Sequence, residues 1–167
     1  TDGEWHEILF AFSKLKQSGK MVVLVTNSAL ANNPTVKIRQ FLVENGNIES
    51  IIELPDRLLE NVGIELYAVV LSHGNKGIKF LDASQAYTEQ RRKKDIDVTT
   101  VLENLANPEI SRFESIESIA REDYNLLPKR YTLKTNIIDG VPLGEICSIN
   151  RGLVISSKEL DDFVTDI

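Results

Sequence analysis

The sequence has few of the residues that cross-link a protein or bind metals. It contains one cysteine, Cys147, so an internal disulfide is impossible and a reducing, cytoplasmic setting is expected. Its two histidines, His6 and His73, lack the spaced cysteine or carboxylate neighbours typical of a metal site. No apolar run approaches the roughly 20 residues of a membrane helix, and Thr1 does not begin a signal-peptide pattern. We therefore expect neither a metal nor a membrane partner.

The sequence also lacks a strong excess of basic residues. The net charge of the chain is −6, which argues against a domain that binds nucleic acid through its own charge alone. The chain has one run of basic residues, Arg91-Arg92-Lys93-Lys94, which is flanked by Asp95 and Asp97. A solvated loop is the favoured interpretation of this run, and a contact with phosphate is the alternative.

What is present is an alternation of two hydrophobic spacings. The runs predicted to be strands are residues 21–25, 48–54, 66–72 and 78–81. The segments predicted to be helices are residues 5–17, 36–44, 98–105 and, capped by Ser115, 116–121. Polar residues 85–94 are predicted to form a loop, and residues 123–131 an extended segment.

This alternation indicates an α/β fold rather than a helical bundle or a β-sandwich. Open α/β sheets bind ligands beyond the carboxyl ends of their strands. The loops that follow Val25 and Leu54 are therefore the expected position of a functional site.

Five motifs in order along the chain point to a family. They are residues 19–30 (GKMVVLVTNSAL), 38–42 (IRQFL), 48–55 (IESIIELP), 63–84 (from GI to FLDAS) and 123–131 (DYNLLPKRY). The last is similar to an Asp-Tyr-Asn-Leu-x-x-x-Arg-Tyr ending and is fairly specific. Together they resemble the methylase (modification) subunit of type I restriction-modification systems, a family of adenine-specific DNA methyltransferases.

The resemblance implies the C-terminal half of a Rossmann-like, S-adenosylmethionine-dependent methyltransferase sheet with flanking helices. Residues 1–90 would belong to the methyltransferase domain, and residues 91–134 would form a helical and extended region that closes it. Residues 135–167 look like a linker and the start of a target-recognition domain of the specificity-subunit type. The chain is therefore expected to be a piece of a longer polypeptide, cut at both ends.

The function implied by the resemblance is transfer of a methyl group from S-adenosylmethionine to adenine in DNA. The implied partners are DNA and a specificity subunit or fused target-recognition domain, and a restriction subunit is a further candidate. In this family the glycine-rich cofactor loop and the Asn-Pro-Pro-aromatic motif lie upstream of the region matched here, and the sequence contains neither. No catalytic or cofactor-binding residue is therefore assigned, and the chain alone is expected to be inactive.

The residues expected near DNA or the target base are Asn27, Arg57, Leu59, Tyr124, Arg130 and Tyr131. Asn27 follows a strand, where it could serve the site or only the turn. Arg57 could contact phosphate. Leu59 occupies a position where the family carries an aromatic residue, which forfeits base stacking worth roughly 1–3 kcal/mol. The aromatics near the end of the 123–131 motif could stack on a base or dock this segment onto the domain.

Two other functions remain open at the level of sequence. The chain could be a non-catalytic scaffold that docks a specificity or restriction partner. It could also be an unrelated small α/β domain that binds a ligand. The first would lack the two upstream motifs altogether, and the second would fold cooperatively as residues 1–134 alone.

Overall fold

The computed structural model describes residues 3–59, 64–90, 93–133, 141 and 143–148. The chain divides into two compact units, residues 1–134 and 135–167. In the second unit the structure describes one short helix, α7 (Leu143–Ile146). Most of the expected start of a target-recognition domain therefore lies outside the described residues.

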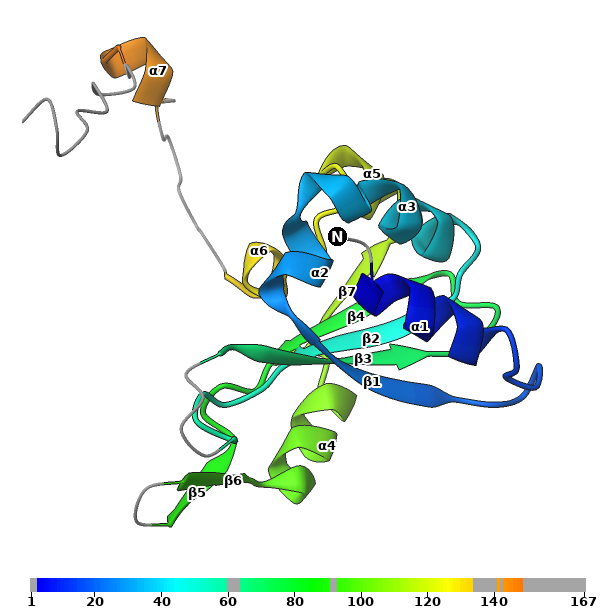
Figure 1. Cartoon of the computed structure of the whole chain (residues 1–167). Coiled ribbons are helices and arrows are strands. Elements are labelled where there is room, and N and C mark those ends of the chain that lie inside the picture. The colour runs from blue at the N-terminus through cyan, green and yellow to red at the C-terminus, as the bar shows by residue number, and fades with distance from the viewer. Residues whose placement is uncertain (1–2, 60–63, 91–92, 134–140, 142, 149–167) are drawn as a thin grey trace, which may run out of the picture. The chain divides into compact units, whose positions relative to one another are not determined.

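The first unit is built on a five-stranded sheet (Figure 1). Its strands are β1 (Met21–Thr26), β2 (Ile48–Glu53), β3 (Leu66–Leu71), β4 (Gly77–Asp82) and β7 (Arg112–Ser115), in the order β1-β3-β2-β4-β7. Strand β3 pairs antiparallel with both β1 and β2, β2 pairs parallel with β4, and β7 pairs antiparallel with β4. The predicted α/β class is confirmed.

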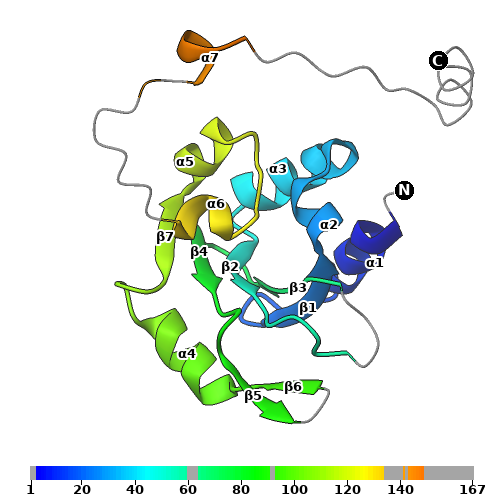
Figure 2. The same cartoon turned by 90° about the vertical axis from the view of Figure 1, so that its left-hand side faces the viewer.

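Helices lie on both faces of this sheet (Figures 1 and 2). The elements on one face are α1 (Gly3–Phe12), α2 (Asn27–Ala31), the 3-10 turn η1 (Asn33–Thr35), α3 (Val36–Glu44), α5 (Ile116–Arg121) and α6 (Lys129–Thr132). The other face carries α4 (Val98–Ala106). Asp97 caps α4, because its carboxylate accepts a hydrogen bond from the Thr100 amide (3.1 Å).

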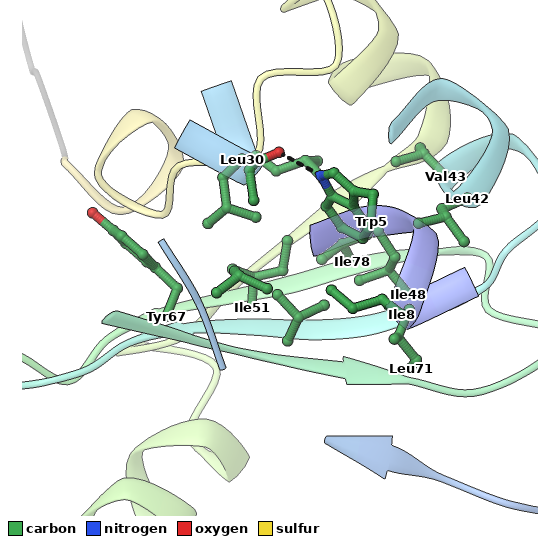
Figure 3. Close-up of a cluster of buried hydrophobic side chains, with 14 of the residues drawn as sticks. Trp5, Ile8, Leu30, Leu42, Val43, Ile48, Ile51, Tyr67, Leu71 and Ile78 are labelled. Atoms are coloured by element: carbon green, nitrogen blue, oxygen red, sulfur yellow. Dashed lines mark hydrogen bonds between the residues drawn. The ribbon is translucent and has the colours of Figure 1, made fainter. Parts of the chain in front are cut away.

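The main core fills the space between the sheet and the first face of helices (Figure 3). Trp5, Ile8 and Phe12 recur at helical spacing along α1 and are buried, as the sequence pattern predicts. Trp5 also donates a hydrogen bond from its indole Nε1 to the Ala29 carbonyl (3.0 Å). Helix α1 is thereby fixed to the chain that leaves β1.

A second, smaller core lies under α4. It joins Ile52, Ala68 and Leu81 of the sheet to Val101 of α4. It also includes Ala86, at the base of a two-stranded hairpin formed by β5 (Tyr87–Gln90) and β6 (Lys93–Ile96). This hairpin shows that the prediction of a loop over residues 85–94 is wrong. Its polar strands pair through backbone hydrogen bonds, and such strands lack the hydrophobic alternation that would reveal them.

The prediction of an extended segment over residues 123–131 is also wrong. Asp123 and Tyr124 have left-handed backbones, with φ of 53° and 52°, and the chain turns back at this point. Pro128 then precedes α6, in agreement with the preference of proline for the start of a helix. The predicted helix over residues 5–17 ends at Phe12, and two turns connect it to β1.

Candidate functional site at the carboxyl edge of the sheet

Three strands end together at one edge of the sheet. Because β1 and β2 both run antiparallel to β3 and β4 runs parallel to β2, their last residues, Thr26, Glu53 and Asp82, lie along the same edge. The first residue of β3, Leu66, lies opposite Thr26 there. This is the edge at which open α/β sheets bind ligands, and it carries both of the loops expected to hold the site.

The segment after β1 turns directly into α2. Asn27 is the first residue of this helix and is exposed at the edge. Next to it, the hydroxyl oxygens of Thr26 and Ser28 lie 2.8 Å apart, and the Thr26 amide donates to Oε1 of Glu4 (3.3 Å). A shallow pocket of about 140 Å³ lies between α1 and α2, with Glu4, Ser28 and Asn32 among its lining residues.

A buried arginine holds the chain after β1 in place. Arg39 of α3 is 1% exposed and donates to the carbonyls of Tyr124 (Nε, 2.7 Å) and Asn32 (Nη1, 2.8 Å) and to the Thr35 hydroxyl (Nη1, 2.5 Å). Burial lowers the pKa of this guanidinium below its ordinary value, with a smaller opposing effect from Tyr131. The side chain therefore ties the loop that follows α2 to the Tyr124 segment, although the two are far apart in sequence.

The end of β2 carries a buried carboxylate that sequence reasoning missed. Glu53 is buried, and its Oε1 accepts from the Lys129 ammonium at 2.5 Å. Among the described residues, its Oε2 has no hydrogen-bond partner. Burial raises the pKa of Glu53, and Lys129 opposes that rise. The available signal was one acidic residue at the end of the apolar run Ile51-Ile52.

Tyr67 lies opposite Glu53 on β3 and faces the main core. Its hydroxyl donates to Oε2 of Glu65 (3.1 Å), which keeps the ring at this edge. Burial, followed by the charges of Glu53 and Glu65, raises the pKa of Tyr67 to about 12. At this edge a neutral phenol therefore lies beside the carboxyl groups of Glu53 and Glu65, and the positive charge of Lys129 offsets part of their negative charge.

The loop after β2 presents two of the expected DNA-proximal residues. Leu59 is 50% exposed. Arg57 is exposed and has a left-handed backbone (φ 56°), and its Nε lies 3.4 Å from Oδ2 of Asp56. Residues 60–63, which include Gly63 at the start of the fourth motif, lie outside the described residues.

The three expected residues of the C-terminal motif contact the domain itself. Tyr131 stacks on Phe80 of β4, with ring centroids 4.1 Å apart, and Tyr124 donates from its hydroxyl to Oε1 of Glu44 (2.6 Å). Arg130 forms an ion pair with Glu122 (2.7 Å). These contacts match the docking interpretation of the aromatic residues, and contact with a base stays a prediction.

The basic run also has a structural member. Lys94 is buried beside Asp56, whereas Arg91 and Arg92 lie outside the described residues. Within the described ranges, no three histidine, cysteine or acidic side chains gather in a way that could hold a metal ion. No helix in that part of the chain is both long and apolar enough to cross a membrane.

Comparison with known proteins places this chain in a family. The family model described as N-6 DNA Methylase matches residues 1–139. This chain belongs to the N-6 DNA methylase family. The type I restriction enzyme MjaVII methylase subunit of Methanocaldococcus jannaschii is 31% identical over 178 aligned residues, which cover 98% of this chain and 30% of that subunit.

Solved structures share the fold. The type I restriction-modification methyltransferase subunit from Streptococcus thermophilus matches with a TM-score of 0.71 and 24% identity, over 77% of this chain and 30% of that one. The modification subunit of a putative type I restriction enzyme from Vibrio vulnificus YJ016 matches with a TM-score of 0.58 and 18% identity, over 75% of this chain and 31% of that one. The chain thus spans about 30% of the length of these N-6 DNA methylases.

Proposed function

We propose that this chain forms the C-terminal part of the catalytic domain of an adenine-specific DNA methyltransferase in a type I restriction-modification system. The reaction is transfer of a methyl group from S-adenosylmethionine to the exocyclic amino group of adenine. The match to the N-6 DNA methylase model over residues 1–139 carries this proposal. Support also comes from the convergence of the Asn27 and Leu59 loops at one edge of the sheet.

The described residues do not form a cofactor cradle of their own. Gly46 precedes β2 and Gly77 begins β4, at the end of these strands away from the candidate site. A Cβ at either would meet a backbone carbonyl, that of Asn75 at 2.3 Å or that of Glu114 at 2.2 Å. These glycines therefore serve chain packing rather than close approach of a nucleotide. We assign S-adenosylmethionine to the parent protein and place its loop upstream, so this chain supplies the DNA side of the site.

A target base must leave the DNA stack to reach such an enzyme. In the proposed site, the exposed Leu59 packs against the extruded base, and the guanidinium of Arg57 contacts a backbone phosphate. Asn27 follows strand β1, which β3 separates from β2, and lies at the same edge. Tyr124, Arg130 and Tyr131 hold the C-terminal segment against the sheet.

The proposed partners follow from the same family. DNA and a specificity subunit, or a fused target-recognition domain beginning within residues 135–167, would complete the enzyme, and a restriction subunit would join the larger assembly. The relatives are named as subunits of type I restriction enzymes, which supports this arrangement. The expected location is the cytoplasm, where the chromosome is methylated.

The direct test is methyl transfer by the complete polypeptide that contains this chain, assayed with its specificity partner. Labelled S-adenosylmethionine should give labelled N6-methyladenine in DNA. Binding of the partner without any incorporation of label would reject catalysis and leave a docking scaffold.

Two leucine substitutions assign the site within this chain. Leu59→Asp should lower the rate of transfer roughly tenfold or more, because it puts a charge beside the base and the DNA backbone. Leu102→Asp is the matched control, since Leu102 is a 60% exposed leucine on α4, outside the loop Pro55–Leu59. Equal loss from both substitutions would contradict the assignment of the edge.

A further inference from the structure

The β5–β6 hairpin contains an unusually buried lysine. The side chain of Lys94 is 8% exposed, although lysine is among the residues least often buried. Its ammonium forms an ion pair with Oδ1 of Asp56 and lies 3.9 Å from the ring centroid of Tyr87. The hydrogen bond from Lys94 lowers the pKa of Asp56, so this carboxyl stays charged at neutral pH.

The same lysine holds the loop after β2 through its backbone. The Lys94 amide donates to the Arg57 carbonyl (3.3 Å), at the residue whose φ of 56° is left-handed. A non-glycine residue persists in this conformation only where its surroundings stabilise it. The ion pair to Asp56 and this hydrogen bond thus fix two successive residues of the loop to one residue of the hairpin.

Apolar contacts connect the two segments as well. Leu58 packs against the second core. Ala86, just before β5, belongs to that core, and Ile96, at the end of β6, packs against it. The Asp97 amide donates to the Ala86 carbonyl (3.0 Å) and closes the base of the hairpin. Figure 1 shows β5 and β6 beside the loops that leave the sheet, on the side that carries α4. The hairpin is therefore anchored independently of the loop that it contacts.

We propose that the β5–β6 hairpin is a brace that sets the orientation of the loop Pro55–Leu59 toward DNA, and that Lys94 is its positioning residue. This inference rests on the proposed function, because the proposed function is what assigns this loop to contact with DNA. Lys94 acts through Asp56 and Arg57 and does not touch the DNA. The brace holds Arg57 and Leu59 in place before DNA arrives. The loop therefore loses less conformational entropy when it binds DNA.

The test compares lysine variants in the complete methylase with its specificity partner. Lys94→Met should raise the KM for DNA roughly tenfold, because the loop loses its fixed geometry. The Kd for S-adenosylmethionine and the thermal midpoint should stay unchanged. Hydrogen exchange at the backbone amide of residue 94, which donates to the Arg57 carbonyl, should accelerate. Lys76→Met is the matched control, since it removes the same charge from an exposed loop position and should leave that exchange unchanged.

A second variant separates positioning from direct phosphate contact. Asp56→Asn should reproduce both effects of Lys94→Met, and the double variant should be no worse than either single variant, as for two members of one interaction. If Asp56→Asn leaves the KM for DNA unchanged while Lys94→Met raises it and flattens the salt dependence of DNA binding, Lys94 is a phosphate contact and the brace is rejected.

The outcomes also separate this inference from the proposed function. If the wild-type complex transfers no methyl group, the proposed function fails, and exchange at the residue 94 amide still decides whether the hairpin holds the loop. Unchanged exchange in both variants would overturn the brace whether or not the complex is active. If Lys94→Met does not fold, Asp56→Asn carries the same test.

Discussion

Arg39 offers the sharpest test of how the site is held together. We expect Arg39→Met to destabilise the chain strongly, because methionine keeps the apolar part of the side chain but has no donor. The Tyr124 carbonyl then loses a charged hydrogen bond of 2.7 Å. The Asn32 carbonyl loses one of 2.8 Å but still accepts from the Thr35 amide at 3.2 Å. Arg39 also donates to the Ala29 carbonyl from Nη1, at 3.4 Å. That carbonyl keeps its hydrogen bond from Trp5, at 3.0 Å, when Arg39 is replaced.

The magnitude follows from two opposing effects. The three hydrogen bonds that the guanidinium donates to Tyr124, Asn32 and Thr35 contribute roughly 5–9 kcal/mol together. Removing the guanidinium also relieves the cost of burying a charge, which is on the order of a few kcal/mol. We therefore expect the free energy of unfolding to fall by about 2–4 kcal/mol. The stability of Arg39→Lys should lie between those of the wild type and Arg39→Met. An ammonium is a compact group and lacks the planar fork with which the guanidinium reaches both carbonyls.

The assay is urea unfolding of the 167-residue chain, followed by the fluorescence of its one tryptophan, Trp5. Trp5 is buried beside Ala29, so it reports on the region that Arg39 holds. Lys37→Met is the control, as Lys37 is an exposed cation on the same helix and should change stability by less than about 0.5 kcal/mol. The reasoning is refuted if Arg39→Met unfolds at the wild-type urea concentration, or if Arg39→Lys restores full stability.

Three further predictions follow from particular contacts. Glu53→Gln should be at least as stable as the wild type at pH 7 in urea unfolding, and its advantage should vanish below about pH 4. The folded protein holds the Glu53 proton to a higher pH than the unfolded chain does, so its ionisation costs stability as the pH rises; an equal loss at both pH values would contradict this. Gly46→Ala should cost about 1–3 kcal/mol more than Gly74→Ala in thermal unfolding. Both glycines have positive φ, but a Cβ at Gly46 would meet the Asn75 carbonyl at 2.3 Å and one at Gly74 meets nothing within 4 Å, so equal costs would reject the close approach. Leu59→Phe should strengthen DNA binding by the complete enzyme by roughly 1–3 kcal/mol through restored stacking, and an unchanged Kd would show that this side chain does not meet the base.

Strands and amphipathic helices were predictable from the sequence because their side chains carry the signal. The run Met21–Val25 and the run Ile48–Leu54 became β1 and β2 within a residue at either end. The position of Asn27 and Leu59 at the carboxyl edge followed from the α/β pattern alone. In each case the burial of one face requires apolar residues at a regular spacing, and this hydrophobic periodicity is visible in the sequence alone.

The features that the sequence did not reveal depend on contacts between distant residues. The β5–β6 hairpin is polar. Its Lys94 can be buried because the ammonium forms an ion pair with Asp56 and lies over the ring of Tyr87. Likewise, the left-handed turn at Asp123 and Tyr124 is held by Arg39 from across the domain. Neither lysine nor arginine carries a pattern that distinguishes a buried partner from a solvated charge. The ion pair of Glu53 with Lys129 was missed for the same reason.

The outer edge of the sheet bears on how the proposed enzyme is assembled. Among the described residues, β1 pairs with β3 alone, so its other side presents backbone donors and acceptors, and its Val22 and Leu24 are exposed. Apolar edge strands of this kind attract other chains and are normally covered or paired. The methylase and methyltransferase subunits that the chain resembles are about three times its length. Pairing of a further strand with β1 would cover both the unpaired backbone groups and these two exposed side chains.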